Sequence, residues 1–193
     1  MFNTPCHHIK DDMKITGYRT LSTFHTWGRA IGDVNGAIDA AVTEVQIVIL
    51  ETDGGIEGVG IGSHADIDRL FPALEGEDPR AVSALFDRMV ARVFKSGHAG
   101  ATYGGLATLD AALWDIKAKA AGEPLWRLLG ARDRFVPGYA SGLDIALSTD
   151  ELSAFYSRMA ERGYVAGTLK GGLDLQADLE RLGVMADALR VNT

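Results

Sequence analysis

The order of secondary-structure patterns after residue 134 is the feature that most constrains the fold of this chain. A strand pattern at 135–141 is followed by a helix pattern at 148–162, a second strand pattern at 164–170 and a second helix pattern at 174–190. Short loops join these segments, and strands that alternate with helices are typical of a parallel sheet with crossover helices. The sequence therefore predicts two β/α units, far fewer than the eight of a closed barrel of about 250 residues.

The segment before residue 134 follows a different pattern, which predicts a small antiparallel sheet and a group of helices. Runs rich in β-branched and aromatic residues predict three strands at 14–26, 41–50 and 56–61. Asp53-Gly54-Gly55 marks the tight turn of a hairpin between the last two runs. Apolar residues at helical spacing then predict helices over 82–93 and 106–116.

Composition and charge exclude several classes of protein. The single cysteine, Cys6, excludes a disulfide framework and any CxxC zinc or redox site. A net charge of −7 argues against a nucleic-acid partner. No apolar run approaches the ~18 residues of a membrane helix, and the first residues lack the pattern of a signal peptide. We therefore expect a cytoplasmic protein that binds neither nucleic acid nor membrane.

The 23 glycines of the chain do not form a phosphate-binding loop. Gly58-Val59-Gly60-Ile61-Gly62 lacks the GxGxxG spacing, and the glycine-rich stretch at 100–105 lacks the Lys-Ser/Thr ending of a P-loop. Tight turns and close backbone packing are the better interpretation of these glycines.

Lys170 is the most informative single residue of the sequence. It closes the second predicted strand after residue 134 and precedes Gly171-Gly172 and a helix. In parallel α/β folds the carboxyl ends of the strands carry the chemistry, and Thr168, two positions earlier, faces the same way. The pattern alone supports a functional lysine and an ordinary solvated strand end equally.

Three stretches of the sequence resemble the enolase superfamily, in its mandelate racemase / muconate lactonizing enzyme branch. Residues 57–62 resemble the end of the hairpin in the family's capping domain. Residues 111–130 are similar to the helix motif ALWDIxGKxxGxPxxxLLG, which is the most specific match. Residues 162–172 resemble the strand GYxxxKxKxG that delivers a catalytic lysine. The likeness spans about residues 14–190, nearly the whole chain.

The resemblance implies an α+β capping domain over residues 1–130, with a three-stranded antiparallel sheet plus helices. Residues 131–193 would be the first two β/α units of a TIM-like (β/α)7β barrel. In this superfamily a carboxylate substrate binds Mg²⁺, a Lys or His base removes the α-proton, and the metal stabilises the enediolate. The resemblance thus implies Mg²⁺ as cofactor, a small-molecule carboxylate as substrate and a homo-oligomer.

The resemblance also assigns roles to individual residues. Lys170 matches the second lysine of the family's Lys-x-Lys pair, the usual general base, and Thr168 stands in place of the first. Thr168 cannot supply the neighbouring cation that in the family would lower the pKa of the base. The loops of the capping domain and the first barrel strand imply a set of candidate substrate-binding residues: His25, Trp27, Arg29, His64 and Ser141. Loop packing for the histidines and Trp27, and a surface charge for Arg29, are the alternatives.

The expected activity is the Mg²⁺-dependent removal of the α-proton of a hydroxy-acid or sugar-acid carboxylate, with dehydration of an acid sugar as the first choice. A racemase or epimerase of the same superfamily is the alternative within this chemistry. A short, non-catalytic binding or interaction module is the alternative of another class. In the family the metal ligands and the acid/base partner lie on later strands, so we expect them beyond residue 193 and expect residues 1–193 alone to be inactive.

Overall fold

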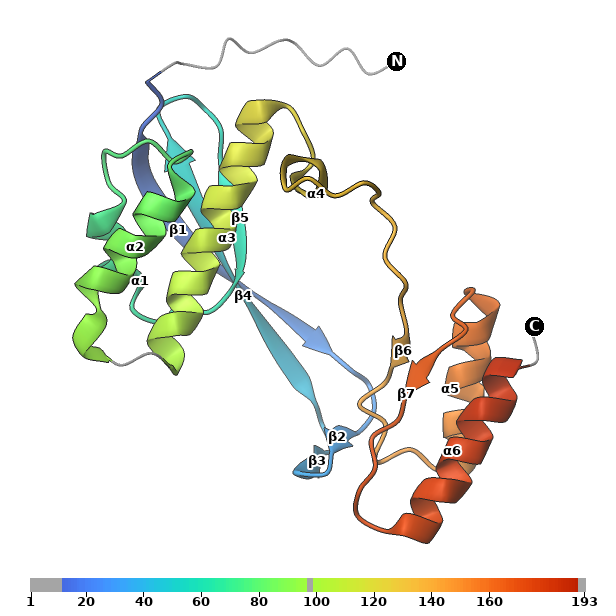
Figure 1. Cartoon of the computed structure of the whole chain (residues 1–193). Coiled ribbons are helices and arrows are strands. Elements are labelled where there is room, and N and C mark those ends of the chain that lie inside the picture. The colour runs from blue at the N-terminus through green and yellow to red at the C-terminus, as the bar shows by residue number, and fades with distance from the viewer. Residues whose placement is uncertain (1–11, 97–98, 191–193) are drawn as a thin grey trace. The chain divides into compact units, whose positions relative to one another are not determined.

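The computed structural model describes residues 12–96 and 99–190 of the chain (Figure 1). The contacts within the chain divide it into two compact units. The first unit consists of Met1–Phe24 and Glu44–Arg134, and the second of His25–Thr43 and Phe135–Thr193. The loop at 25–43 therefore groups with the segments that follow residue 134. The expected domain boundary between residues 130 and 131 stays a prediction.

A three-stranded sheet runs through the first unit. Its strands are β1 (Ile15–Thr26), β4 (Val42–Thr52) and β5 (Gly58–Gly62), in the order β1-β4-β5. β4 and β5 form an antiparallel hairpin in which Val48 lies opposite Gly60. The three predicted strands and the predicted hairpin turn are thus confirmed.

Helices cover one face of this sheet. They are α1 (Ile67–Leu70), α2 (Val82–Arg92), α3 (Ala101–Ala121) and α4 (Leu125–Leu128), with 3-10 turns at Phe71–Ala73 and Phe94–Ser96. The long helix α3 lies along β5 (Figure 1). Leu109, Leu113 and Ile116 of α3 are fully buried in one core with Val48 and Leu50 of β4. The periodicity that predicts helix at 106–116 is therefore the buried stripe of a longer helix.

Alternate glycines of β5 allow α3 to approach the sheet closely. A Cβ atom on Gly60 would lie 1.9 Å from the carbonyl oxygen of Thr108, and one on Gly58 would lie 2.1 Å from that of Ala112. Both distances are far shorter than any real contact of a Cβ atom, so no side chain fits at these positions. The interpretation of these glycines as close backbone packing is confirmed.

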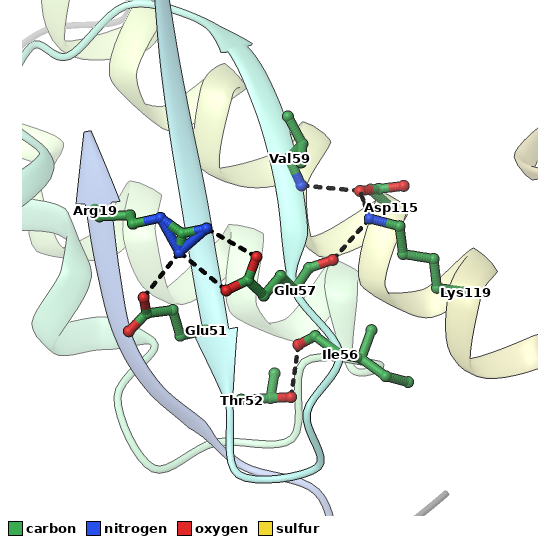
Figure 2. A network of polar contacts seen from close by, with 8 residues as sticks. All are labelled: Arg19, Glu51, Thr52, Ile56, Glu57, Val59, Asp115 and Lys119. Carbon is green, nitrogen blue, oxygen red and sulfur yellow. Dashed lines mark hydrogen bonds and ion pairs between the residues drawn. The ribbon is translucent and has the colours of Figure 1, made fainter. Parts of the chain in front are cut away.

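Charged side chains link the strands to α3, as Figure 2 shows. Arg19 of β1 makes two hydrogen bonds, of 2.9 and 2.8 Å, to the carboxylate of Glu57. Lys119 of α3 donates to the carbonyl oxygen of Glu57 at 2.8 Å and to the carboxylate of Asp115 at 2.6 Å. Asp115 also accepts the N–H of Val59 at 2.9 Å. Exposed ion pairs contribute only about 0–1 kcal/mol each, so this network orients the elements more than it stabilises them.

The second unit contains the predicted β/α order. Its elements are a hairpin of β2 (Ile31–Asp33) and β3 (Gly36–Ile38), then β6 (Ala140–Ser141), α5 (Thr149–Glu161), β7 (Gly167–Thr168) and α6 (Leu175–Arg190). β6 and β7 pair in parallel, which confirms the expectation drawn from the alternating pattern. Ser148 forms the predicted capping box with Glu151 at the start of α5. Asp174 caps α6, because its carboxylate accepts the N–H of Ala177 at 2.8 Å.

Both parallel strands are shorter than predicted. The strand expected at 135–141 shrinks to Ala140–Ser141, and the strand expected at 164–170 shrinks to Gly167–Thr168. Pro137 has no N–H to donate to a ladder, and Phe135 and Val136 are 75% and 85% exposed. β-branched and aromatic composition favours a strand, but only a paired neighbour completes one. None of the helices in the described ranges is long and apolar enough to cross a membrane.

The close packing of β5 on α3 generates a stability prediction. Replacing Gly60→Ala should lower the free energy of unfolding by about 1–3 kcal/mol or more, because the added methyl group must push the α3 backbone away. Urea-induced unfolding followed by circular dichroism measures the change. The neighbouring Val59 is 39% exposed, and Val59→Ala should stay within about 0.5 kcal/mol of the wild type. Equal stabilities for both variants would contradict the proposed close contact.

Candidate functional site

The carboxyl ends of β6 and β7 bring three of the candidate residues together. Ser141 of β6 and Thr168 of β7 are direct partners in the parallel ladder. Lys170 lies two positions beyond Thr168, where β7 has already ended, and it is half-buried. The sequence prediction that Lys170 lies at the carboxyl end of a parallel strand is confirmed, whereas its role as base stays a prediction.

A buried carboxylate lies beside the backbone of Lys170. Asp144 is 0% exposed, and its Oδ1 accepts the backbone N–H of Lys170 at 2.9 Å. The Oδ2 atom of Asp144 lies 2.8 Å from the hydroxyl of Tyr156 on α5. Arg181 of α6 places its Nη2 atom 3.7 Å from Oδ1 and donates from Nη2 to the Asp144 carbonyl oxygen at 2.7 Å. Asp144 therefore connects both helices of the unit to the end of β7.

Tyr156 is the second buried polar group of this cluster. Its hydroxyl lies 2.8 Å from Asp144 Oδ2 and 2.8 Å from the carbonyl oxygen of Thr168. Burial and the hydrogen bond to Asp144 raise the pKa of Tyr156 above its ordinary value, while the charge of Arg181 opposes the shift. The hydroxyl therefore keeps its proton at neutral pH and serves as a donor to these acceptors.

The loop at 25–43 is attached to the segment that follows β6. Arg29 donates from Nη2 to the carbonyl oxygen of Gly142 and from Nη1 to that of Ala30 at 2.9 Å. The backbone N–H of Gly32 donates to the carbonyl oxygen of Leu143 at 3.0 Å. Arg29 thus lies beside the residue that follows Ser141, and its guanidinium binds backbone rather than standing free as a surface charge.

The aromatic candidates of the same loop contact one another. The ring centroids of His25 and Trp27 are 5.1 Å apart in an edge-to-face arrangement. The Arg29 guanidinium lies 5.7 Å from the centroid of the Trp27 ring, within the range of a cation–π contact. Trp27 Nε1 donates to Thr43 Oγ1 at 2.8 Å. His25 remains exposed at the end of β1, while Trp27 is held by these neighbours.

His64 is described with the first unit alone. Its backbone N–H donates to Gln46 Oε1 at 2.8 Å, and its Nε2 atom lies 3.0 Å from the carbonyl oxygen of Ile47. The side chain lines a cavity of about 360 Å³ whose other walls are Tyr18, Thr20, Asp66, Ile67, Asp68 and Arg69. A ligand-binding role for His64 stays a prediction.

Sequence reasoning missed Asp144 and Arg181 and assigned Tyr156 only to an apolar stripe. Asp144 stands in the loop after the first parallel strand, where functional side chains concentrate. That position is the one signal that could have drawn attention to it. The contacts of Asp144 with Tyr156 and Lys170 join residues 12 and 26 positions away, and no local pattern reports them.

The described residues do not by themselves fit a Mg²⁺ site. Within 12–96 and 99–190 there is no group of three or more His, Cys, Asp or Glu residues that could hold a metal ion. Mg²⁺ requires near-octahedral oxygen ligands, and both carboxylate oxygens of Asp144 already have hydrogen-bond partners. We therefore assign no metal-dependent step to these residues, and the expected ligand positions beyond residue 193 stay a prediction.

Two curated relatives are named as dehydratases of acid sugars. D-mannonate dehydratase of Rhizorhabdus wittichii is 36% identical over 61% of this chain and 31% of its own length. L-talarate/galactarate dehydratase of Salmonella typhimurium is 32% identical over 77% of this chain and 40% of its own length. The chain thus spans between about a third and two fifths of the length of these relatives.

A solved structure shares the fold over most of the chain. A racemase from Streptomyces coelicolor A3(2), crystallised with bound magnesium, is 27% identical and has a TM-score of 0.81. The likeness covers 91% of this chain and 52% of that one. The expected capping domain followed by the beginning of a barrel is thereby confirmed.

The family itself follows from the first part of the chain. Residues 34–130 match the family model of the mandelate racemase / muconate lactonizing enzyme N-terminal domain. This match covers half of the 193 residues and includes the helix motif at 111–130. The chain therefore belongs to the mandelate racemase / muconate lactonizing enzyme family of the enolase superfamily.

Proposed function

We propose that this chain is part of a Mg²⁺-dependent enzyme that removes the α-proton of an acid-sugar carboxylate and then eliminates the β-hydroxyl group. The observation that carries this proposal is Lys170, half-buried at the carboxyl end of β7 and held there through its backbone N–H by Asp144. The names of the two dehydratase relatives support dehydration of a sugar acid.

The chemistry requires a base at this point of the fold. A proton next to a carboxylate is very weakly acidic, because its removal places a second negative charge on the substrate. A bound Mg²⁺ ion supplies charge stabilisation of several kcal/mol for such a state. Within this chain, the Nζ atom of Lys170 would accept the proton, and Thr168 beside it brings no competing charge.

Racemisation or epimerisation is the second candidate activity, since the solved relative from Streptomyces coelicolor is named as a racemase. Both reactions begin with removal of the α-proton. They differ in the next step, because dehydration expels a hydroxide equivalent whereas racemisation returns a proton to the opposite face. Lys170 would serve one face in either reaction, so the assignment of Lys170 is common to both.

We propose that His25, Trp27, Ser141 and His64 contact the substrate, and that Arg29 orients the loop carrying the first two. His25 supports this assignment because it is exposed and stands against the Trp27 ring. Arg29 supports its positioning role because it donates to the carbonyl oxygens of Gly142 and Ala30. A binding role for Ser141 rests on its exposed place at the end of β6.

A cytoplasmic homo-oligomer remains part of the proposal. The family resemblance supports the oligomer, and the absence of a recognisable signal peptide in the sequence supports the compartment. Light scattering of the purified protein and fractionation of the source cells measure these two properties directly.

The Lys170→Ala variant of the enzyme that carries this chain should lose exchange of the substrate α-proton with solvent deuterium by at least about 1000-fold, because a general base contributes about 10²–10⁴-fold. Nuclear magnetic resonance of an acid-sugar substrate in deuterated buffer with Mg²⁺ measures this exchange. Lys95→Ala, on the first unit, is the matched control and should exchange at the wild-type rate.

Exchange by Lys170→Ala at the wild-type rate would remove Lys170 from the role of base. Absence of exchange in the wild-type enzyme across a set of acid sugars would instead favour the non-catalytic module. Residues 1–193 expressed alone should show no Mg²⁺-dependent dehydration, and turnover by this piece would contradict the expected position of the metal ligands.

The His25→Ala variant should raise KM about tenfold or more while kcat changes little. A hydrogen bond to a charged group contributes about 1.5–3 kcal/mol, and its loss from ground state and transition state alike appears in KM. Steady-state kinetics with the substrate identified above measures both constants. Val34→Ala, on the same loop between β2 and β3, is the control, and an equal KM for the two variants would exclude His25 from substrate binding.

A further inference from the structure

We infer that Asp144, together with Tyr156, positions the base by continuing the β6–β7 ladder with side chains and so holding the backbone of Lys170. The inference deepens the proposed function, because it rests on Lys170 being the base. Asp144 does not itself react in this assignment, and it acts only through the residue that it holds.

The first argument is the place at which the backbone ladder stops. β6 ends at Ser141 and β7 ends at Thr168, and these two residues form the last pair. The next polar groups of the chain after that pair are the carbonyl oxygen of Thr168 and the N–H of Lys170. The Tyr156 hydroxyl lies 2.8 Å from the former, and Asp144 Oδ1 lies 2.9 Å from the latter. Two side chains thus take the part of a neighbouring strand beside Lys170.

The second argument is the rigidity of the group that does the holding. Asp144 is completely buried, and Arg181 donates to its carbonyl oxygen at 2.7 Å. The preceding residue, Leu143, has a φ of 48°, a left-handed conformation that leucine rarely adopts. Gly32 donates to the Leu143 carbonyl oxygen at 3.0 Å and supports this conformation. Unusual backbone conformations of this kind concentrate at functional sites.

The third argument is the chemistry of the carboxylate. Burying a charge is costly unless the charge is paired and hydrogen-bonded, so a carboxylate that only filled space would be replaced at no loss by an apolar residue. The two oxygens of Asp144 instead contact two different segments, the backbone of Lys170 and the hydroxyl of Tyr156. A group with this arrangement fixes geometry, which is what a base needs in order to meet a substrate proton.

Substitutions at position 144 can separate positioning from mere folding. In Asp144→Asn, the amide oxygen can still accept the Lys170 N–H, and the amide NH₂ can donate to Tyr156, whose own proton then serves the Thr168 carbonyl oxygen. In Asp144→Ala, both contacts are lost. Asp187→Ala is the matched control, since that carboxylate is 82% exposed on α6.

The experiment measures kcat and KM for α-proton exchange per folded enzyme, together with hydrogen exchange of the Lys170 amide by mass spectrometry. For Asp144→Ala we expect kcat to fall about 100-fold at nearly constant KM, since a displacement of about 1 Å costs a factor of this size. The Lys170 amide should exchange at least about tenfold faster. Asp144→Asn should restore both values to within a few-fold, and Asp187→Ala should leave them unchanged.

Wild-type kcat and wild-type Lys170 amide exchange in folded Asp144→Ala would overturn the inference. If Asp144→Ala does not fold, Tyr156→Phe decides, because it keeps the buried ring and removes only the hydroxyl. Tyr156→Phe should then lower kcat and accelerate Lys170 amide exchange, and wild-type values for both would overturn the inference. A failure of the proposed function is recognised separately, by full exchange activity in Lys170→Ala, and the amide measurement then decides alone whether Asp144 holds this strand end.

Discussion

The buried carboxylate of Asp144 is the interaction on which the second unit depends. Four segments meet at it, namely the loop after β6, helix α5 through Tyr156, the end of β7 through Lys170 and helix α6 through Arg181. An isolated buried charge would be unstable by several kcal/mol, so all of these partners must be in place together. The parallel pair β6–β7 is only two residues long, and this cluster supplies order where the short ladder cannot.

The first unit is held together by a different principle. Its core is apolar, and the contact between α3 and β5 depends on glycines that bring two backbones close together. The charged network of Arg19, Glu57 and Lys119 lies on the exposed side of this contact, where solvent weakens it. The first unit therefore provides a stable support, and the buried polar chemistry is concentrated in the second unit.

Sequence reasoning reached different depths in the two units. The hairpin with Asp53-Gly54-Gly55, the core stripe of α3 and the capping box of Ser148 are local patterns, and the structure confirms them. The strands at 135–141 and 164–170 were predicted too long, because strand composition does not report where a partner strand ends. Among the site residues, Lys170 stood out because it combined a strand end with a glycine pair. Asp144 did not, because its partners are distant in the sequence.

The sequence by itself determined the order of the elements, the family and the identity of the candidate base. These properties follow from periodicity, turn residues and motifs, which act over a few neighbouring positions. Only the tertiary structure decided that Arg29 binds the backbone after β6, that the loop at 25–43 groups with the β/α segments, and that Asp144 and Tyr156 hold the end of β7. The physical reason is that hydrogen bonds between distant segments depend on how the chain packs, and packing leaves no periodic trace in the sequence.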